Sequence, residues 1–361
     1  MEYPEIGRDG KYSKVSNRQS SISLIMSNEN ISIGVVIPTK NRPQLVQRAV
    51  NSAREQTHKN IEIIVVIDGE DRATVTALEA IADARIKIVQ LPESKGGGAA
   101  RNAGVKEARG EWIAFLDDDD CWLPTKLEAQ LQKAIASSSP DPIVSCYVTA
   151  QTPKGTFTYP QRLPAPQEHL SEYLLVRNGL HFGEGLIQTS TIFTSKKLLQ
   201  QVPFDENLAK HQDWDWILRA NRIPGVAVMF VTQTLAIWYL WEKRQSISSS
   251  YNCYKSLDWI DSHRHLVTPK AYSSFLITQV APQAASARQW QLFSPLLWAA
   301  WRKGQPRLRD ILLYWGMWLI PRSTRRSLRS LLSIALPMYI RTISYRFVNS
   351  FKGLTSYRNS N

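Results

Sequence analysis

The sequence predicts an α/β fold: a mostly parallel sheet with helices on both faces, followed by a helical and basic appendage. Three observations predict it. Short β-branched runs alternate with helical patterns over the first 150 residues, which is typical of strand–helix–strand units. Polar residues follow the ends of these runs, where open α/β sheets bind ligands. Basic residues, by contrast, gather towards the end of the chain.

The expected elements follow one another in the order that such a sheet requires. The first strand, at 33–37, is a β-branched run closed by Pro38, and Pro43 suits the first position of the next helix. Further strands are expected at 61–67, 85–91, 112–116 and 143–148, with helices at 75–81, 96–108 and 123–136.

Beyond residue 150 the pattern is less regular. Residues 150–170 are rich in Pro, Thr and Gln, which indicates a loop or hairpin over the site. Two closing strands are expected at 226–231 and 235–240, and short helices at 168–176, 196–201 and 213–220.

Composition excludes several classes of protein. Of the 361 residues, 43% are hydrophobic and 21% are charged, which is ordinary for a globular chain and argues against wholesale disorder. The three cysteines lack paired spacing, which indicates a reducing cytoplasm without a zinc site or a disulfide framework. The net charge of +13 lies almost wholly in the last 76 residues, which carry +12 and therefore indicate an anionic partner.

Four consecutive aspartates, Asp117, Asp118, Asp119 and Asp120, follow the strand at 112–116 and are the most informative feature. Adjacent carboxylates repel one another unless water or a hard cation neutralises them. Mg²⁺ or Mn²⁺, held by one or two carboxylates and by phosphate oxygens, is the usual solution. The alternative is a solvated acidic loop at a helix start, and the pattern alone leaves both open.

Two further motifs lie at neighbouring strand ends. Asp68 precedes Gly69, so it is either a contact to a nucleobase or ribose or an ordinary turn residue. The segment Lys95 to Asn102 holds three glycines and then Arg101, which would pair with a diphosphate or hold the acidic cluster in place. The glycine spacing excludes a P-loop.

A third motif, His211 to Trp216, places Asp213 and Asp215 among aromatic residues at a helix start. An aspartate partly desolvated by tryptophan would serve as a general base for an acceptor hydroxyl. The alternative is a helix cap with Trp214 or Trp216 in the core.

Together these motifs resemble family 2 glycosyltransferases of the GT-A fold, whose Rossmann-like, mostly parallel sheet is sandwiched by helices. The resemblance runs from about residue 33 to residue 239. It rests on the order and spacing of seven blocks, namely Val36–Arg42, Asp68–Gly69, Gly96–Gly104, Leu116–Asp120, Trp122–Glu128, Phe204–Glu206 and Asp213–Arg219.

The resemblance implies a role for each matching residue. Pro38, Thr39, Asn41 and Arg42 would line the nucleoside pocket, and Asp68 would contact the base. Asp118 would lie near the ribose or donor sugar, and Arg101 is the candidate partner of the diphosphate. Asp117 and Asp119 would hold the metal, Mg²⁺ or Mn²⁺. Asp213 would be the base of a single, inverting displacement, and the segment Gly185 to Thr191 would shape the acceptor side.

The sequence departs from the family pattern in three places. Ile67 replaces the first acid of the usual Asp-Asp pair, and Gln212 stands where a glutamate often precedes the base. No QxxRW motif follows, which favours the addition of one sugar over processive synthesis.

The end of the chain favours attachment to a membrane surface. Residues 290–348 mix tryptophans with apolar runs cut by arginine, and the longest clean run, 311–320, is too short to span a bilayer. This is typical of amphipathic helices in the headgroup region, which would suit a lipid-linked acceptor. The alternative is a helical subdomain packed on the catalytic domain.

These patterns predict three regions: a disordered extension without a secretory signal at 1–30, a catalytic domain at 31–245 and a basic helical region at 246–361. We expect a cytoplasmic enzyme, peripheral on the inner face of the cell membrane. It would move one sugar from a UDP-, GDP- or dTDP-sugar to a hydroxyl acceptor of a lipid-linked or surface-polysaccharide precursor. We expect no nucleic-acid partner. The alternatives are a sugar-phosphate nucleotidyltransferase, or a non-enzymatic binder of anionic polymers through the tail.

Overall fold

The computed structural model describes residues 30–153, 155–178, 184–240, 252–320 and 324. They form two compact units. The catalytic unit, as we call it below, holds the described residues up to 240 together with 263–268, and the helical unit holds 252–262 and the residues from 269 onward. The extension predicted at 1–30 lies outside the described residues, apart from Asn30, and so does the tail beyond 320, apart from Thr324.

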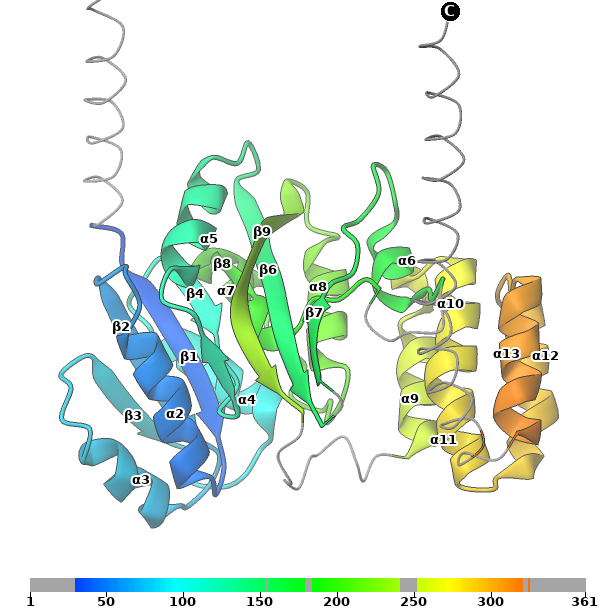
Figure 1. Ribbon diagram of the computed structural model, residues 1–361, viewed down its shortest axis with the longest axis horizontal. Helices are drawn as coiled ribbons and strands as arrows, with labels where there is room; N and C mark the ends of the chain where they lie inside the picture. Colours follow the sequence, from blue (N-terminus) through cyan, green and yellow to red (C-terminus); the bar gives the residue numbers. More distant parts are fainter. Residues whose placement is uncertain (1–29, 154, 179–183, 241–251, 321–323, 325–361) are drawn as a thin grey trace, which may run out of the picture. The chain divides into compact units, whose positions relative to one another are not determined.

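One mixed sheet forms the centre of the catalytic unit, in the order β3-β2-β1-β4-β8-β6-β9-β5, with β7 paired to β6 (Figure 1). Its strands are β1 (Ile33–Thr39), β2 (Ile61–Ile67), β3 (Ile86–Gln90), β4 (Trp112–Phe115), β5 (Asp120–Trp122), β6 (Asp141–Thr152), β7 (Gly155–Tyr159), β8 (Phe193–Ser195) and β9 (Val226–Tyr239). Strands β1 to β4 are mutually parallel, which confirms the predicted parallel half. The short strands β5, β7 and β8 pair antiparallel.

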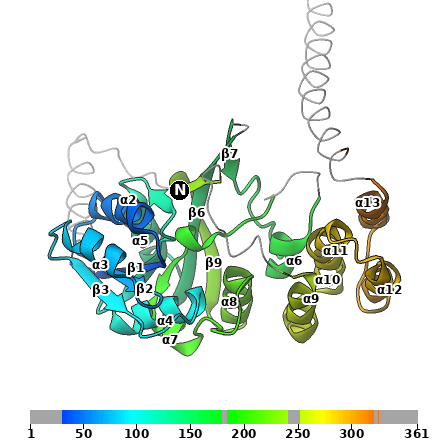
Figure 2. The ribbon, with the colours of Figure 1, turned by 90° about the horizontal axis from the view of Figure 1, so that it is seen from below.

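Helices cover both faces of this sheet (Figure 2). They are α2 (Pro43–Arg54), α3 (Arg72–Glu79), α4 (Gly97–Glu107), α5 (Lys126–Ile135), α6 (Leu170–Leu175), α7 (Lys196–Gln201) and α8 (Gln212–Ala220). Alternate side chains of β1 and β2, such as Val35 and Val65, pack with α2, α3 and α5 in one core. Val36 and Val66 point to the other face, where the bare Cα of Gly104 lets α4 approach closely.

Three sequence predictions needed correction. Strand β1 continues through Pro38, because β4 pairs with β1 only as far as Val36 and needs no donor from the proline. The helix predicted from Leu123 begins at Lys126, since β5 takes Asp120 to Trp122 into the sheet against β9. The two predicted closing strands are one strand, β9, which is irregular against β6 beside Tyr147.

The helical unit contains five α-helices within its described residues: α9 (Cys253–Ser262), α10 (Pro269–Phe275), α11 (Ala281–Ser286), α12 (Phe293–Arg302) and α13 (Leu308–Leu319). A π-helical turn, η4 (Leu276–Val280), joins α10 to α11 and is buried except for Gln279. The predicted helices of this region are therefore present. Among the described residues, no helix is both long and apolar enough to cross a bilayer.

Candidate functional site

The parallel strands β1, β2 and β4 bring their carboxyl ends to one edge of the sheet. Thr39 ends β1, Asp68 follows β2 and Asp117 follows β4 after one residue. The backbone N–H of Asp68 donates to the carbonyl of Thr39 (2.9 Å), and the Thr39 hydroxyl donates to Oδ2 of Asp118 (2.8 Å). The sequence motifs therefore converge on one site, as the topology of an open α/β sheet requires.

Arg42, just before α2, lies between two carboxylates of the acidic cluster. Its Nη1 is 3.0 Å from Oδ1 of Asp118 and 3.2 Å from Oδ2 of Asp119. Burial raises the pKa of Asp118, and the charge of Arg42 and the bond from Thr39 oppose that rise only in part. A guanidinium thus neutralises this side of the cluster.

Arg101, on α4, connects the cluster to α8. Its Nη2 is 2.7 Å from Oδ1 of Asp117, and its Nη1 donates to Oε1 of Gln212 (2.6 Å). The side chain is almost buried and lies over the ring of Phe204. Arg101 is thus in contact with the acidic cluster, as one of its two predicted roles requires, and its pairing with a diphosphate stays a prediction.

Asp213 lies in the first turn of α8, one residue after Gln212. Its Oδ1 accepts a hydrogen bond from the backbone N–H of Trp214 (2.9 Å). Burial raises the pKa of Asp213 to about 6, against the lowering influence of that bond and of Arg101. A carboxylate with this pKa is ionised at neutral pH and still basic enough to accept a proton, as a general base requires.

The neighbours of Asp213 have structural roles. Asp215 is fully buried and ion-paired with Arg219 (2.6 Å) and His263 (3.0 Å). Burial raises its pKa, but the bonds from His263 and Arg219 outweigh burial and leave it lowered. Trp216 lies in the core and donates to the carbonyl of Val202 (2.7 Å). Asp213 is thus the aspartate of this motif that remains for chemistry.

Asp68 is held by the loop that precedes α4. Its carboxylate accepts bonds from the Ser94 hydroxyl (2.7 Å) and from the backbone N–H groups of Lys95 (2.7 Å) and Gly96 (3.0 Å). Gly96 has a φ of 91°, which a side chain rarely adopts, so the loop geometry needs glycine there. The structure thus places Asp68 at the site edge, with its side chain already fixed by the protein.

Asp71 was missed by the sequence analysis and orients Asn41. It caps α3 through the backbone N–H of Thr74 (3.0 Å) and also accepts from the backbone N–H of Asn41 (2.9 Å). Asn41 has a φ of 54°, a conformation that asparagine tolerates. The Asp-x-x-Thr spacing is a capping signal that would have found the residue, though not its bond to Asn41.

A buried polar network, also missed, joins the acidic cluster to the segment Gly185 to Thr191. The fully buried Asp120 accepts from the side chains of Gln188 and Ser190, both at 2.6 Å. The Ser190 hydroxyl in turn accepts from the backbone N–H of Asp117 (3.0 Å). Burial and the nearby carboxylates raise the pKa of Asp120 well above its usual value. Asp120 therefore has a structural role: its hydrogen bonds connect the predicted acceptor segment to the acidic cluster.

The remaining two carboxylates have the donor chemistry of a hard-cation site. The side chains of Asp117 and Asp119 are 25% and 15% exposed, whereas Asp118 and Asp120 are buried and hydrogen-bonded. Within the described ranges no group of three or more His, Cys, Asp or Glu is placed to hold a metal ion. Two carboxylates nevertheless suffice for Mg²⁺ or Mn²⁺ when phosphate and water oxygens complete the shell, so the residues fit such an ion.

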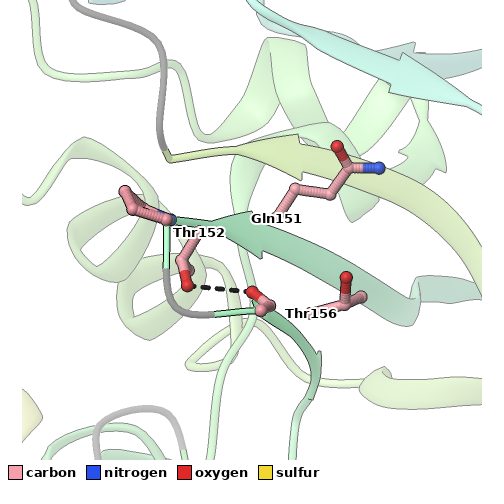
Figure 3. A pocket seen from close by; sticks show the side chains of 5 residues that line it. Gln151, Thr152 and Thr156 are labelled. Carbon is pink, nitrogen blue, oxygen red and sulfur yellow. Dashed lines mark hydrogen bonds between the residues drawn. The ribbon is translucent and has the colours of Figure 1, made fainter.

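A hollow lies at the tip of the β6–β7 hairpin (Figure 3). It is lined by Gln151, Thr152, Pro153, Gly155 and Thr156, and the Thr152 hydroxyl donates to the carbonyl of Gly155 (2.9 Å). None of these residues has an ionisable side chain, so the hollow supplies no acid, base or carboxylate ligand.

Comparisons with known proteins indicate the family of the chain. Residues 34–201 match the model of the family described as "Glycosyl transferase family 2". The amylovoran biosynthesis glycosyltransferase AmsB of Erwinia amylovora is 29% identical over 259 residues, which are 68% of this chain and 83% of AmsB. The succinoglycan biosynthesis protein ExoO of Rhizobium meliloti is 31% identical over 53% of this chain and 56% of ExoO.

Two solved structures share the fold at low identity. TarS of S. aureus aligns with a TM-score of 0.50 and 18% identity over 80% of this chain and 55% of TarS. The mannosyltransferase PcManGT of Pyrobaculum calidifontis aligns with a TM-score of 0.50 and 13% identity over 87% of this chain and 92% of PcManGT. At these identities the likeness shows the GT-A-like architecture alone.

Proposed function

Since this chain belongs to glycosyl transferase family 2 and transfers a sugar from a nucleotide-sugar donor, we propose that it is an inverting, metal-dependent enzyme that adds one sugar to a hydroxyl acceptor. The observation that carries the proposal is the link from the acidic cluster through Arg101 to the first turn of α8. This link supports the proposal because it would hold the proposed donor site and the carboxylate of Asp213 in fixed positions relative to each other. Because the family consists of glycosyltransferases, we do not retain the two alternative functions raised by the sequence, a sugar-phosphate nucleotidyltransferase and a non-enzymatic binder of anionic polymers.

We propose that the donor binds at the carboxyl edge of β1, β2 and β4. Pro38, Thr39, Asn41 and Arg42 follow or end β1 and would contact the nucleoside, with Asp68 beside them. Asp118 would lie nearest the ribose or the donor sugar. PcManGT was solved with GDP-Man and Mn²⁺, which supports a nucleotide sugar and a divalent cation for this architecture. Experiment must determine whether the donor is a UDP-, GDP- or dTDP-sugar.

Asp117 and Asp119 would hold Mg²⁺ or Mn²⁺. When bound, the ion supplies positive charge that stabilises the leaving diphosphate. Arg42 and Arg101 already supply positive charge at the same two carboxylates. Arg42 would bind the diphosphate when Asp119 turns to the ion, because a guanidinium suits paired phosphate oxygens.

Asp213 is the proposed base. Its carboxylate accepts the proton of the acceptor hydroxyl as that oxygen forms a bond to the anomeric carbon. The bond from the anomeric carbon to the diphosphate oxygen breaks on the opposite face, and the electron pair leaves with the nucleoside diphosphate. One displacement of this kind inverts the anomeric carbon. Gln212, held by Arg101, fixes the turn of α8 that carries Asp213.

We propose that the acceptor is a lipid-linked or surface-polysaccharide precursor that approaches along the segment Gly185 to Thr191. The relatives support this class: AmsB and ExoO are named for polysaccharide biosynthesis. WfaP of Escherichia coli, 38% identical over 27% of this chain and 39% of WfaP, is named a glucosyltransferase for a diphosphoundecaprenol-linked sugar. Such an acceptor suits a cytoplasmic enzyme held at the inner face of the cell membrane, with 31–245 as catalytic domain and 246–361 as attachment region.

The test is thermal stabilisation of the full chain by a panel of UDP-, GDP- and dTDP-sugars, with Mg²⁺ or Mn²⁺ and with a chelator. We expect the sugars of one nucleotide, UDP, GDP or dTDP, to raise the Tm, and to do so only when the metal is present. Asp119→Asn should remove that rise, because the ion loses a carboxylate, whereas Asp258→Asn, at an exposed position of α9, should retain it. Equal stabilisation with chelator, unchanged by Asp119→Asn, would refute metal dependence.

A further inference from the structure

The outer layer of the helical unit is formed by α12 and α13. Helix α12 packs on α10 and η4, and helix α13 packs on α11 and η4. The inward side chains are Leu296 and Ala300 on α12, and Tyr314, Met317 and Trp318 on α13, all of them buried. Because both helices turn these residues towards the same bundle, their opposite faces point away from it together (Figure 2).

That outward surface is strongly apolar. On α13 the exposed positions 308, 312, 315 and 319 follow the spacing of one helix face. We define the aromatic face as Trp298 (64% exposed), Trp301 (61%), Leu308 (75%), Leu312 (65%), Trp315 (43%) and Leu319 (62%). Of the twelve exposed large hydrophobic residues in the described chain, eight lie between 290 and 320. Such a gathering marks an interaction surface.

The charges beside the aromatic face are of one sign. Arg302 and Arg309 are exposed on α12 and α13. The sole acid between 286 and 320 is Asp310, which is fully buried and bound by Arg307 (2.8 Å). The face therefore presents tryptophan, leucine and arginine without an exposed carboxylate. Tryptophan and arginine are the residues that favour the headgroup region of a bilayer.

We propose that the aromatic face docks on the surface of an anionic lipid bilayer. The indoles of Trp298, Trp301 and Trp315 lie at headgroup level, the leucines reach the acyl boundary, and Arg302 and Arg309 bind lipid phosphates. This deepens the membrane location given under the proposed function. Docking itself does not depend on sugar transfer, so the two are tested separately.

Charge complementarity selects lipid over two other occupants. A second copy would bring Arg302 and Arg309 of both copies together, and the described residues from 286 to 320 hold no exposed acid. The segment 321–361 adds eight Lys and Arg and no Asp or Glu, so it too would repel the face. An anionic bilayer supplies both the apolar layer and the negative charge.

The experiment is sedimentation of the full chain with vesicles of phosphatidylcholine alone or of phosphatidylcholine with phosphatidylglycerol. We expect binding to the anionic vesicles, weakened by salt. The double variant Trp298→Ser/Trp301→Ser should lower that binding at least about tenfold, because two indoles leave the interface. Arg302→Gln/Arg309→Gln should lower it by a comparable factor and reduce the salt dependence, since each cation near anionic lipid contributes about 1 kcal/mol.

The matched control is Phe157→Ser, which removes an aromatic ring of 44% exposure from β7 of the catalytic unit and should leave vesicle binding unchanged. Donor-induced thermal stabilisation should be the same in every variant, which shows that each is folded and separates this proposal from the catalytic one. Absent binding by the unaltered chain overturns the proposal. So does full binding by the tryptophan variant, or light scattering that shows a dimer which the tryptophan variant dissociates.

Discussion

The two units differ in how much charge they bury and how much apolar surface they expose. The catalytic unit buries ionisable groups, including Asp118, Asp120, Asp215 and Lys126, and provides each with a polar or aromatic partner. Lys126 donates to Gln130 (2.6 Å) and lies over the ring of Trp122 (4.0 Å), and burial lowers its pKa to about 8. The helical unit instead exposes tryptophan and leucine.

The difference shows where each unit meets its partner. Carboxylates gathered at one sheet edge repel one another, so they stay in place only because guanidinium groups and hydroxyls offset their charge. That organisation prepares a site for a small charged ligand inside the protein. Exposed tryptophans gain free energy only when something covers them, which is why we propose that the helical unit docks on a partner. Four predictions test this contrast.

The largest effect is expected from Asp213→Asn. Asparagine keeps the shape of the side chain but cannot take the proton of the acceptor hydroxyl. Transfer should therefore fall about 10³-fold in kcat, within the range for the loss of a general base. Donor-induced thermal stabilisation should remain, because the acidic cluster is unchanged. Turnover close to that of the unaltered chain would exclude Asp213 as the base.

Glycine substitutions test whether the units can be weakened one at a time. A Cβ on Gly104 would lie 2.4 Å from Cγ1 of Val36, and a Cβ on Gly304 would lie 2.0 Å from Oγ of Ser273. Each alanine variant should lose about 1–3 kcal/mol of stability through overpacking. Gly104→Ala should weaken donor binding and leave vesicle binding, and Gly304→Ala should do the reverse.

The control for both is Gly316→Ala on α13, where the nearest atom to the added Cβ is 3.9 Å away. That variant should be neutral or slightly more stable, since alanine favours helix over glycine. Urea denaturation, read with donor and vesicle binding, measures all three. If Gly304→Ala weakened donor binding as much as Gly104→Ala does, the units would not be separable in function.

The pH dependence of transfer should follow Asp213. Its pKa is raised to about 6. Above that pH the carboxylate is ionised and the enzyme is active, and below it protonation of the carboxylate removes the activity. From pH 7 to pH 5 the value of kcat/KM should fall about tenfold, with a midpoint near 6. The residual activity of the Asp213→Asn variant should not show this fall between pH 7 and pH 5. A midpoint near 4 would mean that the carboxylate is solvated during turnover and that its surroundings do not raise its pKa.

The sequence could predict the parallel half of the sheet and the convergence of Thr39, Asp68 and Asp117, because local periodicity sets strands and parallel strands end at one edge. It could not predict that Ser190 would bond Asp120, since 70 residues separate them and neither has a distinctive local pattern. Strand β5 was missed for a related reason: its three residues pair only with the distant β9. Long-range polar contacts of this kind depend on tertiary packing.

The smallest effect is expected at an exposed ion pair of the helical unit. Lys303 Nζ is 2.9 Å from Oδ1 of Asp261, and both side chains are 36% exposed. Solvent screens such a pair, so Lys303→Gln should change the free energy of unfolding by less than about 1 kcal/mol. In the catalytic unit, Arg219→Gln leaves the fully buried Asp215 with His263 as its ion-pair partner and should cost up to roughly 3 kcal/mol. Urea denaturation of both variants measures the contrast, and equal losses would show that burial of the carboxylate does not raise the contribution of the pair.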